Sequence, residues 1–185
     1  MLFRSRGLGP TEVFTGDDRA GGEIGEVIVS GPVVTREYFG RPEATALAKI
    51  VDPSRGVFYH RMGDLGYLDD RGRLWFCGRK SHRVVLADET LFTICVERVF
   101  DTHPEVARTA LVGVERPSGK EAVLCVEAAR SLGRRDLARV REELAALGAK
   151  FDHTRKVRTI LFHPSFPVDI RHNSKIFREK LAVWA

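Results

Sequence analysis

The chain has 185 residues, of which 43% are hydrophobic and 30% charged. This composition is typical of a globular protein and excludes a collagen-like or disordered chain, and the length favours one domain or two small ones. Thirty lysines and arginines against 25 aspartates and glutamates give a net charge of +5. Most basic residues are interleaved with acidic ones, so this charge indicates a solvated surface rather than a nucleic-acid-binding stripe.

The spacing of the cysteines and histidines and the length of the apolar runs argue against a metal site, a redox motif and a membrane helix. Cys77, Cys95 and Cys125 lack the paired spacing of a zinc or redox motif, and the histidines lack the spacing of metal ligands on a helix or ribbon. We therefore expect reduced thiols and no metal site. No stretch reaches the roughly 18 apolar residues of a membrane helix, and no signal-peptide pattern opens the chain. The sequence predicts a cytoplasmic protein without a transmembrane segment.

The first part of the chain predicts a small β-rich unit with one helix. Residues 1–21 are rich in glycine and polar residues without periodicity, so we expect an irregular N-terminal segment. A strand pattern covers residues 23–29, a short helix covers residues 43–50 after Pro42, and a second strand covers residues 57–60. These elements offer too few apolar residues for a complete core, which indicates that the unit packs against another structure.

A β-hairpin is predicted directly after this second strand. Two apolar segments, Leu65–Leu68 and Leu74–Cys77, flank the turn-forming residues 69–72. Asp64 lies at the start of the hairpin and Arg79 at its end. A carboxylate accepts hydrogen bonds from a sugar diol, and a guanidinium offers a planar fork of donors, so the two side chains are candidates for a nucleotide site. A surface hairpin with a solvated aspartate and arginine explains the same residues equally well.

Residues from about 81 to the end predict a compact α+β domain. The patterns predict strands over 83–86, 91–93, 107–114, 122–128 and 157–162, and helices over 95–100, 134–149 and 175–184. Two of these strands are nearly continuous apolar runs, as expected for strands that are covered on both faces. We therefore expect a three-stranded sheet with covering helices.

Lys175 follows a polar, proline-containing loop and is predicted to lie at or near the N-terminus of the last helix. The partial positive charge of helix-terminal amides favours anions, and an ammonium group beside it would strengthen the attraction for phosphate or carboxylate. The structural alternative is a solvated first-turn lysine that follows a cap at Asn173 or Ser174.

Four spaced segments resemble one family. They are GEIGEVIVSG at 22–31, YHRMGD at 59–64, GRK at 78–80 and PVDIRHNSKIFREKL at 167–181. In order and spacing they are similar to the closing portion of the adenylate-forming superfamily, which comprises acyl-CoA synthetases, peptide-synthetase adenylation domains and luciferases.

The resemblance implies a division of the chain and a role for four residues. Residues 22–80 would end a larger β-rich N-terminal domain, and residues 81–185 would form a small mobile C-terminal lid. In that family pattern Asp64 contacts the ribose hydroxyls of ATP, Arg79 supports the ribose or a phosphate, and Lys175 bridges the α-phosphate and the substrate oxygen. Ser81 occupies the position about which the lid turns. The implied cofactors are ATP and Mg²⁺, with the metal-binding carboxylate expected outside this chain.

Some positions depart from the family pattern, and others resemble one group of its members more than the rest. Ser81 stands where the hinge residue is usually aspartate or lysine, and residues 85–92, VLADETLF, lack the glycine usual in that part of the lid. The missing glycine disfavours a coenzyme A tunnel and favours a ligase that needs no thiol. Residues 73–84, 100–114 and 167–185 further resemble the β-lactone-forming members of the family. In those members, the 3-hydroxyl of a long-chain β-hydroxy fatty acid attacks its own activated carboxyl group.

The glycine-rich phosphate loop, the adenine pocket and the acyl pocket of a full ligase have no counterpart in this sequence. We therefore expect the isolated chain not to adenylate a substrate. Its expected partners are ATP and a long-chain β-hydroxy fatty acid in the complete enzyme, together with the missing N-terminal domain or other biosynthetic enzymes. A fatty-acyl-CoA ligase fragment and a non-catalytic partner module of a larger ligase are the alternatives, and nucleic-acid binding is not expected.

Overall fold

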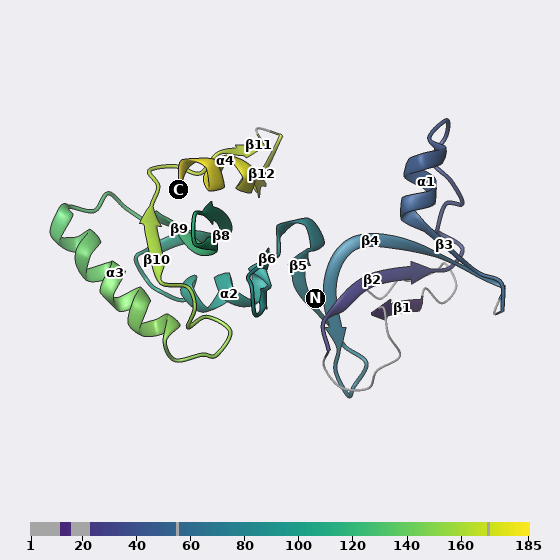
Figure 1. The fold of residues 1–185 in the computed structure, drawn as a ribbon, viewed down its shortest axis with the longest axis horizontal. Helices are drawn as coiled ribbons and strands as arrows, with labels where there is room; N and C mark the ends of the chain where they lie inside the picture. Colours follow the sequence, from purple (N-terminus) through teal and green to yellow (C-terminus); the bar gives the residue numbers. More distant parts are fainter. Residues whose placement is uncertain (1–11, 16–22, 55, 170) are drawn as a thin grey trace. The chain divides into compact units, whose positions relative to one another are not determined.

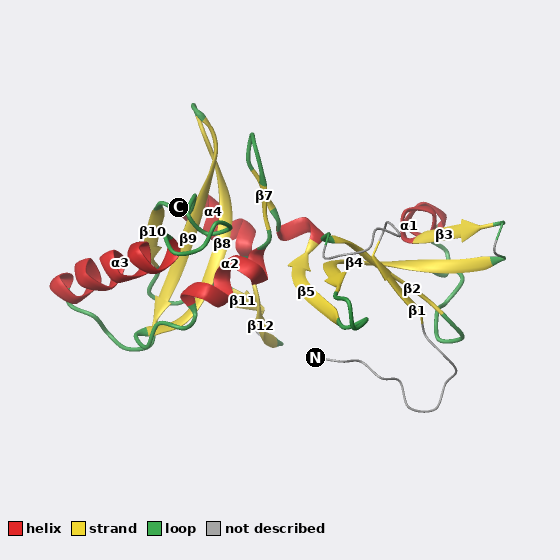
Figure 2. Cartoon of the chain, turned by 90° about the horizontal axis from the view of Figure 1, so that it is seen from below, coloured by secondary structure: helices red, strands yellow, loops and turns green. Residues whose placement is uncertain are grey.

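A computed structural model of the chain describes residues 12–15, 23–54, 56–169 and 171–185. The chain divides into two compact units, unit 1 with residues 1–81 and unit 2 with residues 82–185. Figure 1 follows the chain by colour through both units, and Figure 2 separates helices, strands and loops.

Unit 1 is an antiparallel sheet with one short helix. Its elements are β1 (Glu12–Thr15), β2 (Gly25–Ser30), α1 (Pro42–Ala48), β3 (Lys49–Asp52), β4 (Val57–Leu68) and β5 (Leu74–Arg79). The strand order is β1-β2-β4-β3, and β5 also pairs with β4. The long strand β4 pairs with β2 along one edge, and with β3 and then β5 along the other. Figure 1 shows α1 beside the β3 end of this sheet.

The predicted hairpin is present as β4 and β5. The Gly72 amide donates to the Asp69 carbonyl oxygen at 2.8 Å to close the turn, and Gly72 has a φ of +68°, which favours glycine. The Asp69 carboxylate accepts hydrogen bonds from the Arg73 amide at 2.9 Å and from Trp75 Nε1 at 2.9 Å. A Cβ at Gly66 would lie 2.6 Å from the Trp75 carbonyl oxygen, so the two strands approach closely only because position 66 has no side chain.

Unit 2 contains a three-stranded sheet, two small hairpins and three helices in its described residues. The elements are β6 (Val84–Val85), β7 (Thr90–Leu91), α2 (Thr93–Phe100), β8 (Val106–Arg116), β9 (Gly119–Ala128), α3 (Arg134–Gly148), β10 (Thr159–Phe162), β11 (Val168–Asp169), β12 (His172–Ile176) and α4 (Arg178–Trp184). In the sheet, of order β10-β9-β8, β9 pairs antiparallel with β8 and parallel with β10.

Helices cover both faces of this sheet, and one of them, α4, is the last element of the chain. One apolar cluster joins α2 and α3 to one face, with Phe100 and Leu144 fully buried against Leu124. The other cluster joins α4 to the opposite face through Leu181, which is also fully buried. The sheet with its covering helices (Figure 1) confirms the predicted α+β class.

Three local predictions were wrong. Residues 12–15 form β1 and pair with β2, whereas an irregular segment was expected; the rest of that segment, 1–11 and 16–21, lies outside the described residues. The helix predicted over 43–50 ends at Ala48, because Lys49 is extended and Lys49–Asp52 pairs with β4. The last helix begins at Arg178 rather than at Lys175, because Ile176 pairs with Val168.

Candidate active site

Glu26, Arg61 and Lys80 come from three of the segments that resemble the ligase family, and they meet in unit 1. Arg61 Nη2 lies 2.6 Å and Lys80 Nζ 2.7 Å from Glu26 Oε2. Burial raises the pKa of Glu26, but hydrogen bonds from the two cations together outweigh burial, so the pKa lies below its ordinary value. The shared carboxylate ties β2 and β4 to the residue that follows β5. No spacing rule in the sequence signals this contact.

Asp64 and Arg79 lie opposite each other in the β4–β5 ladder. Their side chains form a salt bridge of 3.0 Å between Arg79 Nη1 and Asp64 Oδ1, and Arg79 Nη1 also donates to the Met62 carbonyl oxygen at 3.0 Å. The Arg79 side chain is 56% exposed and that of Asp64 is 23% exposed. The two residues singled out for a nucleotide are therefore neighbours, joined by an ion pair.

Lys175 is exposed on β12, three residues before α4, so it does not lie at a helix N-terminus as the sequence pattern suggested. Among the described side chains, none forms an ion pair with its ammonium group. Hydrogen bonds from Arg171 lower the pKa of Asp169 on the same hairpin, and the positive charge of Lys175 contributes to that lowering. Lys175 is thus an accessible cation carried by a strand.

Glu97 and Arg178 form a buried ion pair in unit 2 that the sequence reading missed. Arg178 Nη2 donates to Glu97 Oε2 at 2.9 Å, and the side chains are 14% and 6% exposed. Burial raises the pKa of Glu97, although hydrogen bonds from Arg178 oppose that shift. Charged residues are rarely this buried, but no local pattern in α2 or α4 separates this pair from solvated charges.

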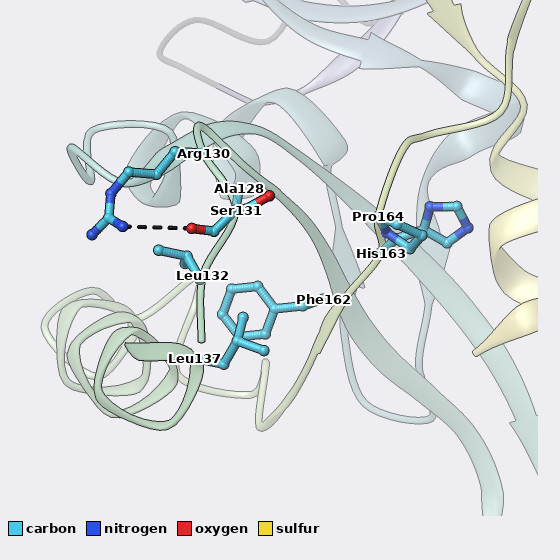
Figure 3. Close-up of a pocket in the computed structure, with 8 residues that line it drawn as sticks. All are labelled: Ala128, Arg130, Ser131, Leu132, Leu137, Phe162, His163 and Pro164. Carbon is cyan, nitrogen blue, oxygen red and sulfur yellow. Dashed lines mark hydrogen bonds between the residues drawn. The ribbon is translucent and has the colours of Figure 1, made fainter. Parts of the chain in front are cut away.

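A surface hollow of about 490 Å³ lies in unit 2 between the ends of β9 and β10 and the start of α3. Figure 3 shows Leu132, Leu137 and Phe162 on one side and His163 with Pro164 on the other. Ala128, Arg130 and Ser131 complete the lining. The Arg130 guanidinium is paired with Glu105 and donates to the Ser131 carbonyl oxygen at 3.5 Å, so it is already engaged within the protein.

The predicted hinge residue, Ser81, is the last residue of unit 1 and lies in the 3₁₀ turn Lys80–His82. In the described ranges, no group of three histidine, cysteine, aspartate or glutamate side chains could hold a metal ion. Within the same ranges, no helix has the length and apolarity needed to cross a bilayer. The three cysteines are thiols that form no disulfide bond.

Sequence comparison finds close relatives among ligases, although no family model matches the chain. The chain is 52% identical over 170 residues to an olefin β-lactone synthetase of Xanthomonas campestris and 54% identical over 168 residues to one of Stenotrophomonas maltophilia. These matches cover 90% and 89% of this chain but only 30% of each relative. A 2-succinylbenzoate–CoA ligase of Geobacillus kaustophilus is 41% identical over 93 residues, which is 50% of this chain and 18% of that ligase.

Solved structures give the same relationship at the level of the fold. An amide bond synthetase from Marinactinospora thermotolerans superposes with a TM-score of 0.76 at 28% identity, over 94% of this chain and 34% of that structure. An o-succinylbenzoate–CoA synthetase from Bacillus subtilis, solved with its acyl-adenylate intermediate, has a TM-score of 0.71 at 25% identity, over 92% of this chain and 33% of that structure. By sequence and fold, the chain is therefore homologous to the C-terminal portion of the adenylate-forming ligases.

Proposed function

We propose that the chain forms the C-terminal part of an ATP-dependent, adenylate-forming ligase that converts a long-chain β-hydroxy fatty acid into a β-lactone. The observation that carries this proposal is the 52% identity to an olefin β-lactone synthetase over 170 residues, a match that extends through both units. Because the chain spans only about 30% of that relative, it would act together with the remainder of a ligase.

In this proposal each unit contributes its own side chains. Asp64 accepts hydrogen bonds from the ribose diol of ATP, and the exposed Arg79 guanidinium donates to the ribose or to a phosphate. Lys175 contacts the α-phosphate and the attacking substrate oxygen, where its ammonium group stabilises the negative charge that develops during adenylation. Ser81 is the hinge residue, in keeping with its place where the two compact units divide.

The residues present fit ATP better than they fit Mg²⁺. A paired carboxylate and guanidinium on adjacent strands suit a ribose, and an accessible ammonium group suits a phosphate. Mg²⁺ requires oxygen ligands in near-octahedral geometry, and the described residues gather no such set. We therefore assign the metal-binding carboxylate to the remainder of the ligase and derive no step through the ion.

The decisive experiment places residues 22–185 in a chimera with the preceding part of the Xanthomonas campestris relative. Pyrophosphate release is then measured with ATP and a β-hydroxy fatty acid. Replacement of the cation by Lys175→Ala should lower the rate about hundred-fold or more, because a contact that stabilises developing charge is lost. Lys150→Ala is the matched control, because Lys150 is another exposed lysine of unit 2.

Two outcomes would contradict the proposal. A loss of only a few-fold in the Lys175→Ala chimera would remove the catalytic role of that lysine. Pyrophosphate release by the 185-residue chain alone would show that the chain needs no partner, contrary to the expectation that the phosphate loop and substrate pockets come from elsewhere.

A fatty-acyl-CoA ligase is the second candidate, favoured by the 41% identity to a 2-succinylbenzoate–CoA ligase over half of the chain. Against it, residues 85–92 contain no glycine and form the tight β6–β7 hairpin, closed by a hydrogen bond of 2.8 Å from the Leu86 amide to the Glu89 carbonyl oxygen. Product analysis of the chimera separates the two candidates. A β-lactone formed without coenzyme A supports the first, and a product formed only with coenzyme A supports the second.

A further inference from the structure

The buried pair Glu97–Arg178 fixes the start of α4 against the sheet. Besides its contacts to Glu97, Arg178 Nη1 donates to the Leu111 carbonyl oxygen at 3.1 Å. The Leu111 amide in turn donates to Glu97 Oε1 at 2.7 Å. Both backbone groups of one residue in β8 are thus bound by the pair. A buried ion pair contributes little net stability because desolvation offsets its attraction, whereas its hydrogen bonds here join the first residue of α4 to α2 and β8.

The same pair lies next to Lys175 along the chain. Two residues separate Lys175 from Arg178, so their Cα atoms lie at most about 11 Å apart even when the chain is fully extended. Between them, Ile176 pairs with Val168, and the Phe177 amide donates to the Pro167 carbonyl oxygen at 2.8 Å. The backbone that carries Lys175 is therefore held on one side by the β11–β12 hairpin and on the other by the first residue of α4.

We propose that Glu97 and Arg178 are positioning residues for Lys175. This inference rests on the proposed function, since it assumes that the ammonium group of Lys175 acts in adenylation. Neither residue of the pair needs to contact the substrate, because they act through the backbone of β12 and the start of α4. Placement matters at this scale, since a shift of about 1 Å in a reacting group can cost about hundred-fold in rate.

The kinetic test uses the chimera with Glu97→Gln, which keeps the shape of the side chain but removes its charge. We expect kcat for pyrophosphate release to fall about ten-fold or more, with the KM for ATP changed less than about three-fold. Arg178→Lys keeps the charge but loses the planar fork, so it should give an intermediate kcat. Unchanged kcat in both variants would overturn the inference.

Two further variants separate positioning from a loss of stability. Leu144→Ala leaves a cavity in the apolar cluster that joins α2 and α3 to the sheet, so it destabilises unit 2 while both side chains of the pair and their hydrogen bonds remain, and kcat should stay within about three-fold of the parent. The double variant Glu97→Gln with Arg178→Met removes both charges and should regain stability but not kcat. Recovery of kcat together with the melting temperature would mean that the pair only stabilises the fold, and the inference would fail.

A test without activity uses the 185-residue chain itself. Hydrogen exchange of the Ile176 and Phe177 amides, followed by NMR, should accelerate about ten-fold or more in the Glu97→Gln variant relative to Leu144→Ala at equal global stability. Equal exchange rates in the two variants would overturn the inference. Because this measurement requires no catalysis, it decides the coupling between the pair and β12 even if the chimera is inactive and the proposed function fails.

Discussion

Glu26 and Glu97 are both carboxylates paired with cations, but their surroundings move their pKa values in opposite directions. Around Glu26, hydrogen bonds from Arg61 and Lys80 outweigh the effect of burial and lower the pKa. Around Glu97, burial outweighs the hydrogen bonds from Arg178 and raises the pKa. The direction of each carboxylate's pKa shift therefore depends on whether burial or the hydrogen bonds from its cations have the larger effect.

The lowered pKa of Glu26 predicts the pH dependence of a substitution. Its stabilising effect is present above the unfolded-state pKa of about 4.3 and is lost as the pH falls through the lower folded-state value. Glu26→Gln should lower the free energy of unfolding by about 1 kcal/mol near neutral pH, since both cations are partly exposed and screened by solvent. Urea unfolding of both proteins at several pH values checks this. A difference that persists unchanged well below the folded-state pKa would contradict it.

At the scale of elements, the contact between the end of α3 and α2 depends on a missing side chain. A Cβ at Gly148 would lie 2.8 Å from Cζ of Phe100, a ring that is fully buried. Helix propensity alone would favour alanine over glycine at this position by up to about 1 kcal/mol. The close approach of the ring reverses that preference.

Gly148→Ala should therefore destabilise unit 2 by about 1–3 kcal/mol through overpacking. The matched control is the same substitution together with Phe100→Leu, which removes the ring that the new methyl group meets. The double variant should be more stable than the sum of the two single effects predicts, because the clash no longer exists. Thermal unfolding of the four proteins measures the coupling, and strict additivity would show that Phe100 is not the obstacle.

Elements specified by local contacts could be predicted from the sequence, whereas elements fixed by distant contacts could not. The apolar spacing of Leu137, Val140 and Leu144 placed α3 within one residue of its observed bounds, because an amphipathic helix is specified locally. The start of α4 was misplaced because Ile176 pairs with Val168, a contact that no local pattern contains. In the same way, Asp64 and Arg79 could be found because a hairpin brings its two ends together, whereas the buried pair of unit 2 joins residues 81 positions apart.

At the scale of the whole molecule, the two units differ in how much core they contain. The two apolar clusters described above belong wholly to unit 2. The buried apolar residues described in unit 1 are Val27, Tyr59, Leu65 and Cys77. Unit 1 also exposes several large apolar side chains, among them Phe39 at 99%, Leu47 at 73% and Val51 at 67%.

This asymmetry predicts that residues 82–185 fold alone. A separately expressed chain of these residues should unfold cooperatively, with a melting temperature within a few degrees of the upper transition of the full chain, because its core is complete. Calorimetry of both proteins provides the comparison. A non-cooperative transition in the shorter chain would show that unit 2 depends on residues 1–81.

The hairpin contacts around Lys175 also reduce the conformational entropy that the chain loses when an anion binds this lysine. Since the backbone before Lys175 is ordered by the His172–Asp169 pairing and the backbone after it by the Ile176–Val168 pairing, an anion that binds the ammonium group has little chain left to order. What remains is the rotamer freedom of one lysine, about 2 kcal/mol at most. For a lysine on an unanchored loop, binding would cost about 1–2 kcal/mol more in backbone conformational entropy for each residue that becomes fixed. The strand avoids this cost, so we expect it to bind an anion more tightly than such a loop would.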